Sequence, residues 1–227
     1  MNYSKVIAID GPSGSGKSTI AQIVARKIGH TYIDTGAMFR AIGLHLDNKG
    51  IKESDIDSIQ SELNSFNFNY GLSESELVVI DEVNLTQDIR QHFVSDLASR
   101  YSKISTIRDY LREFQRSLAS SRSCVMEGRD IGTVIFPNAY LKVFLTATDE
   151  VRAVRRQKQL ELKGETVDLE KLIQDIKDRD DRDSKREIAP LIKASDAHEI
   201  LTDDLEIDEV VSKIIELEKE HHLKIIN

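Results

Sequence analysis

The sequence predicts an α/β fold, in which helices flank a five-stranded parallel sheet and an inserted segment carries a small antiparallel sheet. Three observations predict it. A short apolar strand, a Gly-rich turn, a helix and a second strand follow one another near the N-terminus, short apolar strands recur in the second half, and alternating apolar and polar residues stand between them. With 227 residues, 40% of them hydrophobic, the chain can build one sizeable core and a small appendage.

The N-terminal segment predicts a parallel βαβ unit. Residues 6–9 are all apolar and form a buried strand, and a helix is expected from about Lys17 to a C-terminal stop at Gly29. A second strand follows at residues 31–33, and another helix begins at residues 35–36. Strand, turn, helix and strand in this order indicate a parallel crossover.

The middle of the chain has a different pattern. A short amphipathic helix is expected at residues 57–63, and strands at 66–70, 77–80 and 83–85 are expected to form an antiparallel hairpin with a third strand. Apolar residues at helical spacing then predict a long helix over 104–118. Antiparallel strands within a parallel α/β pattern indicate an insertion into the core.

The remaining elements alternate between apolar strands and charged helices. Strands are expected at residues 124–126, 141–145 and 198–201, the last as the fifth strand of the sheet. Helices are expected from the N-cap Thr148 to about residue 163, from the N-cap Asp168 past residue 186, and over 208–219.

Composition favours a protein of the cytoplasm. No apolar run approaches the roughly 18 residues of a membrane helix, and the N-terminal apolar run is too short for a signal peptide. The single cysteine, Cys124, opens an apolar run and is expected to be a buried hydrophobe in a reducing compartment. The net charge of −8 disfavours a nucleic-acid partner, so phosphorylated ligands need local arginine clusters.

Residues 11–18, Gly-Pro-Ser-Gly-Ser-Gly-Lys-Ser, match the complete phosphate-binding loop pattern G-x-x-x-x-G-K-[ST]. Small residues let successive N–H groups point at phosphate oxygens, and the following helix adds its positive end. Lys17 is expected to reach the β- and γ-phosphates of ATP, and the Ser18 hydroxyl to bind Mg²⁺. The expected donor-binding residues are Gly11, Ser13, Gly14, Ser15, Gly16, Lys17, Ser18 and Thr19.

A P-loop is compatible with a small-molecule kinase, a GTPase switch or an ATPase motor. Residues 47–50 match the D-x-x-G of GTPases, but they follow a helix, and residues 48–51 do not form the guanine-binding N-K-x-D. A motor usually has an apolar strand that ends in adjacent acidic residues, and none is evident.

Arginine groups favour the kinase. Two of them have the i, i+3, i+4 spacing of one helix face, and the other arginines follow a core strand or begin a helix. The members are Arg152, Arg155 and Arg156; Arg179, Arg182, Asp183 and Arg186; and Arg129 and Arg40. Each group alone could be a solvated, salt-bridged face. Beside a P-loop they favour phosphoryl transfer, because guanidinium donors stabilise the charge that develops on the transferring group.

Four segments, in order along the chain, resemble those of bacterial cytidylate kinases. They are residues 9–18, 34–40 (Asp-Thr-Gly-Ala-Met-Phe-Arg), 127–133 (Glu-Gly-Arg-Asp-Ile-Gly-Thr) and 179–186 (Arg-Asp-Asp-Arg-Asp-Ser-Lys-Arg). Many kinases share the P-loop, whereas the last two motifs together are much more specific. The resemblance covers nearly the whole chain.

This resemblance implies a P-loop core of residues 1–34 and 119–227, an NMP-binding domain over 35–118, and a lid over about 152–164. It implies ATP and Mg²⁺ as cofactors, CMP and dCMP as acceptors, and a cytoplasmic protein that we expect to be a monomer. The catalytic residues would be Lys17, Arg129, Arg155, Arg156 and Arg179.

The same resemblance implies an acceptor site. The CMP phosphate would meet Thr35, Arg40, Arg129 and Arg179, the sugar would meet Asp183 with Arg186, and the cytosine would meet Ser99, Arg108 and Asp130. The chemistry agrees, because cytosine presents an amine donor to Asp130 where uracil would present an unpaired carbonyl.

Two positions depart from the family pattern. Phe39 stands where tyrosine is frequent and lacks a phenolic donor, and Glu127 stands where aspartate is frequent. A kinase for another acceptor, such as UMP or shikimate, is the nearest alternative, and a catalytically silent nucleotide-binding module is another. Lys17 and the arginine groups disfavour the silent module.

Overall fold

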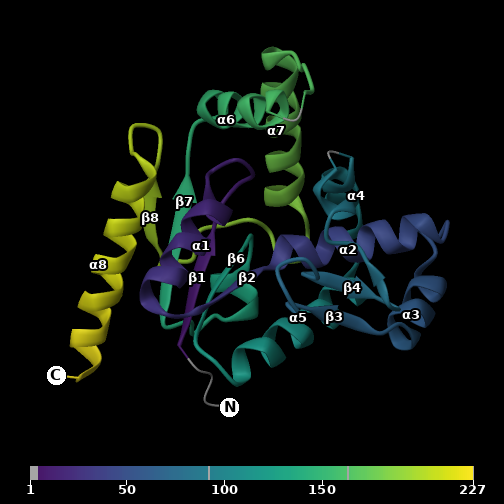
Figure 1. The fold of residues 1–227 in the computed structure, drawn as a ribbon, viewed down its shortest axis with the longest axis horizontal. Coiled ribbons are helices and arrows are strands. Elements are labelled where there is room, and N and C mark those ends of the chain that lie inside the picture. Colours follow the sequence, from purple (N-terminus) through teal and green to yellow (C-terminus); the bar gives the residue numbers. More distant parts are fainter. Residues whose placement is uncertain (1–4, 92, 163, 227) are drawn as a thin grey trace. The chain divides into compact units, whose positions relative to one another are not determined.

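The computed structural model describes residues 5–91, 93–162 and 164–226. The chain divides into two compact units, one formed by the residues up to 33 together with those from 118 onward, and the other by residues 34–117. Figure 1 labels the elements of both.

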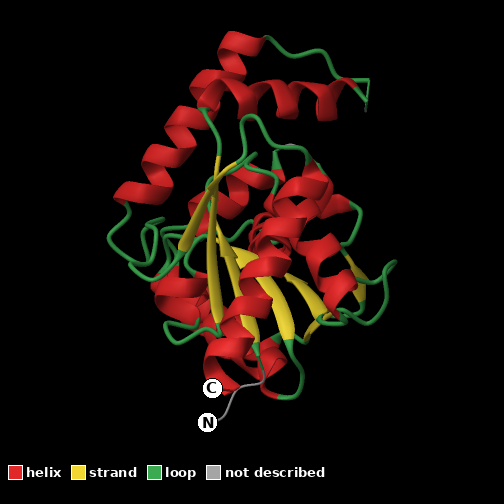
Figure 2. Ribbon diagram, turned by 90° about the vertical axis from the view of Figure 1, so that its left-hand side faces the viewer, coloured by secondary structure: helices red, strands yellow, loops and turns green. Residues whose placement is uncertain are grey.

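The first unit contains the predicted five-stranded sheet (Figures 1 and 2). Its strands are β1 (Val6–Asp10), β2 (Thr31–Asp34), β6 (Cys124–Gly128), β7 (Leu141–Thr146) and β8 (His198–Leu201), in the order β2-β6-β1-β7-β8. The central β1 pairs in parallel with β6 and β7, and β7 with β8. The predicted α/β fold with a parallel sheet is therefore confirmed.

Helices α1 (Lys17–Ile28) and α8 (Ile207–Ile226) pack against this sheet through one apolar core. Ile9 and Val143 of the strands are buried there together with Val24 and Ile214 of the helices. Gly29 ends α1 with a φ of 70°, a left-handed conformation that glycine adopts at little cost, as the sequence predicts.

Helices α6 (Asp149–Glu161) and α7 (Leu169–Lys185) pair with each other through a small apolar cluster that includes Ala153 and Leu172. Thr148 precedes α6 but makes no side-chain capping bond, whereas Asp168 accepts a hydrogen bond from the Lys171 backbone. Residue 163, the expected end of α6, lies outside the described residues. The second helix ends at Lys185, short of the predicted end past residue 186.

A five-residue π-helix, η2 (Ile131–Ile135), follows β6 and Arg129-Asp130. The sequence analysis did not predict it. Such short turns lack the apolar periodicity that identifies longer helices, and they often occur at functional sites.

The second unit contains the predicted antiparallel sheet of β3 (Phe68–Tyr70), β4 (Val78–Ile80) and β5 (Val83–Asn84). Its helices are α2 (Thr35–Asn48), α3 (Ile56–Ser65), η1 (Asp88–Arg90), α4 (Val94–Tyr101) and α5 (Ser105–Ser120). Helix α4 was not predicted. It is only eight residues long and packs against α2 where Gly43 allows close approach, since an added Cβ would lie 3.3 Å from the Leu97 backbone carbon.

Within the part of the chain that the structure describes, no helix has the length and apolarity required to span a bilayer.

Candidate active site

The phosphate-binding loop joins β1 to α1, and its glycines are required by the backbone. Gly11 has a φ of 150°, and a Cβ there would lie 2.0 Å from the Leu145 carbonyl oxygen. Gly16 caps α1 with a φ of 88°. Any other residue would be strained at both positions, so the backbone keeps its curl only with glycine.

Lys17 lies inside this loop and is 5% exposed. Its ammonium group donates hydrogen bonds to the Pro12 carbonyl oxygen at 2.6 Å and to the Ser15 hydroxyl at 3.3 Å. Burial lowers the pKa of Lys17 well below its usual value, and the neighbouring Arg129 lowers it further. A phosphate anion would relieve this repulsion between cations, so the geometry suits a polyphosphate ligand.

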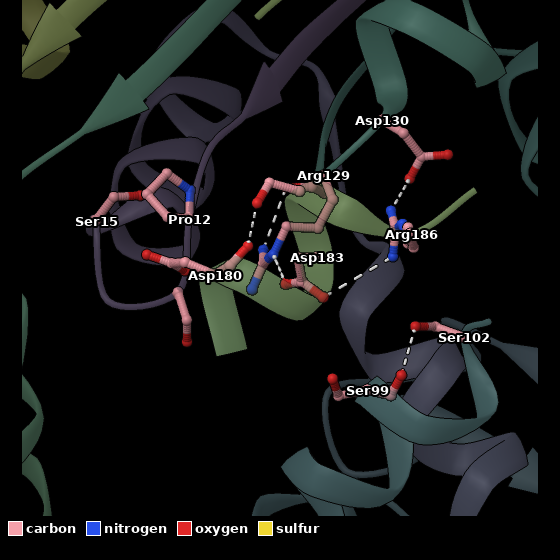
Figure 3. Close-up of polar contacts among 12 residues, drawn as sticks. Pro12, Ser15, Ser99, Ser102, Arg129, Asp130, Asp180, Asp183 and Arg186 are labelled. Carbon is pink, nitrogen blue, oxygen red and sulfur yellow. Dashed lines mark hydrogen bonds and ion pairs between the residues drawn. The ribbon is translucent and has the colours of Figure 1, made fainter. Parts of the chain in front are cut away.

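The first turn of α1 presents two hydroxyls to solvent. Ser18 and Thr19 are both exposed, whereas Ser15 is buried within the loop. Figure 3 labels Pro12 and Ser15, which outline the loop. A hydroxyl at Ser18 is an oxygen ligand of the kind that Mg²⁺ binds together with phosphate oxygens and water.

Arginines and acids from two elements of the first unit meet beyond the end of β6 (Figure 3). Arg129 Nε lies 3.2 Å from one Asp183 oxygen, and Arg186 Nη1 lies 3.9 Å from the other. Arg186 Nη2 also lies 3.6 Å from Asp130 Oδ1. Four residues predicted for the acceptor therefore form one connected ion-pair group.

Asp183 remains ionised in this group. Burial by itself would raise the pKa of its carboxyl, but Arg129, Arg179 and Arg186 together hold that pKa below its usual value. Because Arg179 also lowers the pKa of Lys17, it lies close enough to act on the P-loop and on the acid. Of the arginines predicted on this helix face, Arg179 therefore lies near the P-loop lysine.

The arginines of α6 have other partners. Arg152 is 2% exposed and donates to the backbone oxygens of Ser13 and Ala147, at 2.9 and 3.0 Å, and to Asp149 and Asp180. Its side chain therefore joins the P-loop to both helices of the pair.

Arg155 donates to the Thr202 hydroxyl at 2.9 Å and to the Thr202 carbonyl oxygen at 2.7 Å. The structure thus places the Arg155 guanidinium at Thr202, the residue directly after β8. Arg156 is half-buried on the same helix.

Two buried acids of the first unit were not assigned from the sequence. Asp10 accepts hydrogen bonds from the backbone of Ile131 at 2.9 Å and of Gly132 at 2.7 Å, and burial raises the pKa of its carboxyl to about 6. Glu127 accepts a hydrogen bond of 2.5 Å from the Tyr32 hydroxyl. An acid at the end of an apolar strand directly before a P-loop was the available signal for Asp10.

The second unit holds the remaining predicted acceptor residues. Thr35 is buried at the start of α2, and Arg40 pairs with Asp34 at 2.9 Å one turn later. Asp34 also caps α2 through the Ala37 backbone, so its carboxylate anchors the Arg40 guanidinium to the helix start.

Ser99 and Arg108 are also buried, at 5% and 6% exposure. The Arg108 guanidinium lies 5.4 Å from the centre of the Phe39 ring and donates to the Ser102 carbonyl oxygen at 3.1 Å. The Ser99 hydroxyl has no hydrogen-bond partner among the described residues, although the Ser102 hydroxyl donates to its backbone oxygen (Figure 3). A buried hydroxyl in this state is available to a ligand. Phe39, which stands where the family frequently has tyrosine, provides the aromatic ring over which the Arg108 guanidinium lies.

A possible cation cluster occurs in the same unit. Ligand atoms of His45, Glu62 and Asp81 lie within 4.8 Å of one another. The Lys49 ammonium already lies 2.5 Å from the same Glu62 oxygen that contacts His45, so a positive charge occupies the place of an ion.

Cys124 is buried, and burial raises the pKa of its thiol to about 12. A thiol in this state is not a nucleophile at neutral pH, which agrees with its predicted place in the core.

Comparison with known proteins gives consistent matches over the chain. A sequence model described as Cytidylate kinase matches residues 7–220. The cytidylate kinase of Caldicellulosiruptor saccharolyticus is 47% identical over 212 residues, which cover 93% of this chain and 94% of that protein. The cytidylate kinase of Fervidobacterium nodosum is 44% identical over 94% of this chain and 96% of its own length.

A longer protein also matches. The bifunctional pantoate ligase/cytidylate kinase of Prochlorococcus marinus (strain MIT 9312) is 45% identical over 96% of this chain but only 43% of its own length. Among solved structures, an uncharacterised protein from Eubacterium ventriosum has a TM-score of 0.51 and 16% identity, covering 95% of this chain and 99% of that one. This second likeness concerns the fold alone.

Proposed function

The chain belongs to the cytidylate kinase family, and from that premise we propose that it transfers the γ-phosphoryl group of ATP to CMP and dCMP, giving CDP and dCDP. The observation that carries the proposal is the family match over residues 7–220, within which the cytosine-reading set Ser99, Arg108 and Asp130 is present and buried. The acceptor oxygen is that of a phosphate already ionised at neutral pH, so no general base is required.

The donor triphosphate is proposed to bind along residues 11–19. The backbone N–H groups of the glycine-held loop would surround its phosphates, and Lys17 would exchange its bonds to Pro12 and Ser15 for phosphate oxygens. The lowered pKa of Lys17 supports this exchange, since a phosphate anion restores the charge balance around the amine.

Transfer is proposed to rely on charge stabilisation. As the bond from the γ-phosphorus to the β,γ-bridging oxygen breaks and a CMP phosphate oxygen bonds to phosphorus, negative charge spreads over the transferring oxygens. Lys17, Arg129 and Arg179 belong to one charged group that can hold this charge. Arg155 and Arg156 would join from the lid, residues 152–164, which requires Arg155 to leave Thr202.

A magnesium ion fits the first turn of α1. The exposed Ser18 hydroxyl offers one oxygen ligand, while phosphates and water would complete the coordination. When bound, the ion neutralises charge on the β- and γ-phosphate oxygens.

Base and sugar recognition are proposed for the predicted acceptor set. The unpaired Ser99 hydroxyl and the Arg108 guanidinium, held on Phe39, would donate to the cytosine ring nitrogen and carbonyl, and Asp130 would accept from its exocyclic amine. Thr35 and Arg40 would meet the CMP phosphate, with Arg129 and Arg179. Asp183, held ionised by its arginines, would accept from the sugar hydroxyls, and Arg186 would steady it.

Residues 35–118 are proposed to act as the NMP-binding domain and the rest as the core. The protein is proposed to be a cytoplasmic monomer with small nucleotides as its partners. Its net charge of −8 and its single cysteine support that setting. Light scattering during size-exclusion chromatography tests the monomer.

The reaction is tested by ADP release from ATP and Mg²⁺ with CMP, dCMP, UMP, AMP, GMP or no acceptor. We expect strong turnover with CMP and dCMP and little with UMP. In Asp130→Asn the new amide can donate to the uracil carbonyl, so the CMP-to-UMP ratio of kcat/KM should fall about 10- to 100-fold. If none of the nucleoside monophosphates stimulates ADP release, the proposed acceptor is refuted. Shikimate and related hydroxylated metabolites would then be tested.

A further inference from the structure

Asp10 holds two consecutive backbone N–H groups of another segment. It is the last residue of β1 and directly precedes the P-loop residue Gly11. Its Oδ1 accepts from Ile131 and its Oδ2 from Gly132, at 2.9 and 2.7 Å. Both bonds are fully buried, and the side chain is 5% exposed. One carboxylate is thus committed to the first turn of η2.

The same residue also holds the other end of that segment. In the parallel register of β1 and β6, Asp10 pairs with Gly128. The segment 128–131 is therefore attached to Asp10 at both ends. Gly128 pairs with Asp10 in the sheet, and the Ile131 N–H group donates to the Asp10 side chain. Only Arg129 and Asp130 lie between these two anchors. Both are residues of the proposed acceptor site.

Asp130 is the N-cap of η2, the position whose side chain usually accepts from the second or third N–H group of a helix. It makes no such capping bond here. Asp10 accepts from the first two N–H groups, those of Ile131 and Gly132, and the Asp130 carboxylate lies 3.6 Å from Arg186. An acid from another strand therefore caps η2, while the Asp130 carboxylate faces an arginine of the acceptor group.

Keeping a carboxylate at this place is unfavourable for the fold itself. Burial and the nearby Asp130 raise the pKa of Asp10, while the two backbone bonds and Lys17 oppose the rise. A neutral asparagine would avoid the cost of a buried charge, but its single acceptor oxygen could satisfy only one of the two N–H groups. The carboxylate has a benefit because it holds both N–H groups and thereby fixes the residues between the two anchors.

We propose that Asp10 is a positioning residue for the acceptor: by binding the first two N–H groups of η2 it fixes Arg129 and Asp130 beside the P-loop, in the orientation in which the Asp130 carboxylate meets Arg186 and the base. The proposal rests on the proposed CMP kinase function. Asp10 itself touches neither substrate.

Asp10→Asn tests it, because asparagine has one acceptor oxygen and turns its NH₂ toward the second backbone N–H. KM for CMP should rise and the CMP-to-UMP ratio of kcat/KM should fall, each about tenfold or more, since a hydrogen bond to a charged group is lost. The Kd of ATP without acceptor should change less than about twofold. Lys142→Met is the control, because methionine keeps an aliphatic stem beside Gly132 and loses only the ammonium bonds to Pro137 and Asp196, which lie outside the proposed acceptor site, so the ratio should be unchanged.

A double-mutant cycle separates positioning from general damage. If Asp10 acts through Asp130, Asp10→Asn should lower the ratio in the native protein but not in the Asp130→Asn background. Equal losses in both backgrounds, or reduced stability with KM and the ratio unchanged, would overturn the proposal.

If Asp10→Asn does not fold, Asp10→Glu can be used, because it keeps the charge on a longer side chain. In this variant the CMP-to-UMP ratio of kcat/KM should fall, but by less than in Asp10→Asn. An unchanged ratio in that variant counts against positioning. Failure of the proposed function is distinguishable, because then the native protein itself shows no CMP-dependent turnover.

Discussion

Helices α6 and α7 have the same arginine spacing, but their arginines have different partners. Both place arginines at i and i+3, and both lie in the first unit, packed on each other. On α7, Arg179 acts on Lys17 and on Asp183, at the phosphate-binding end of the sheet. On α6, Arg152 is buried among backbone oxygens and acids, and Arg155 bonds to Thr202.

The difference shows what spacing can and cannot specify. Helical periodicity determines which side chains share a face. The partner of that face depends on the neighbouring elements. The carbonyl oxygens of Ser13 and Ala147 lie beside α6, and they satisfy an arginine without any ligand. On α7, Arg179 lies close enough to the P-loop lysine to lower its pKa, and such a pair of cations favours an anion.

The largest effect is expected on α7. Arg179→Ala should lower kcat about 10³-fold, because a donor to the transferring phosphoryl is lost. The measurement is kcat at saturating ATP and CMP. Lys177→Ala, an exposed neighbour on the same helix, should leave kcat unchanged. A comparable loss in that control would mean that α7 is merely sensitive to charge.

Next is the buried arginine of α6. Arg152→Met removes the buried cation that contacts both Asp149 and Asp180, so the free energy of unfolding should fall by about 3–5 kcal/mol. Urea titration measures it, with the exposed Lys158→Met as the control. The kcat per folded molecule should fall far less than in Arg179→Ala. Normal stability with a large loss of kcat would mean that Arg152, like Arg179, acts in catalysis, which would contradict the contrast between the two helices.

Arg155 sharpens the comparison, since it is proposed to leave Thr202 during catalysis. Arg155→Ala should lower kcat about 10²-fold. Thr202→Val removes the hydroxyl that accepts from Arg155 and donates to the Thr146 carbonyl oxygen but keeps the Thr202 carbonyl oxygen, so it should leave kcat within about twofold. Steady-state kinetics on both variants decides the matter. Equal behaviour of the two would indicate that Arg155 is a structural arginine.

The smallest effect concerns two buried acids. Asp183, with a lowered pKa, contributes stability that is present above 3.8 and lost as the pH falls through its folded value. The stability difference between native protein and Asp183→Asn should therefore shrink only below about pH 4.

Asp10 should behave in the opposite way. Because its folded pKa is raised to about 6, its contribution is full below pH 3.8 and lost as the pH rises through 6. Between pH 7 and 5 the native protein should gain about 1 kcal/mol relative to Asp10→Asn. Urea titrations at several pH values test both acids, and parallel curves for the two variants would contradict the contrast.

The residues alone determined much of this protein. The parallel sheet, the antiparallel insertion and the glycine requirement of residues 11–16 follow from apolar periodicity and backbone sterics, which act within a few residues of the chain. The same local rules predicted that Arg179 and Asp183 share a face. They could not predict η2 or α4, because segments this short have too little periodicity.

Only the tertiary structure decided how the polar side chains are paired. Asp10 and Ile131 are 121 positions apart, and Arg152 and Ser13 are 139 apart. The sequence pattern of one segment does not predict its contact with the other. Parallel pairing of β1 with β6 brings the first pair together, and the packing of α6 brings the second. Once buried, each polar atom must find a partner or incur a desolvation cost, so the fold, and not the spacing, determines which acids and arginines remain for substrate.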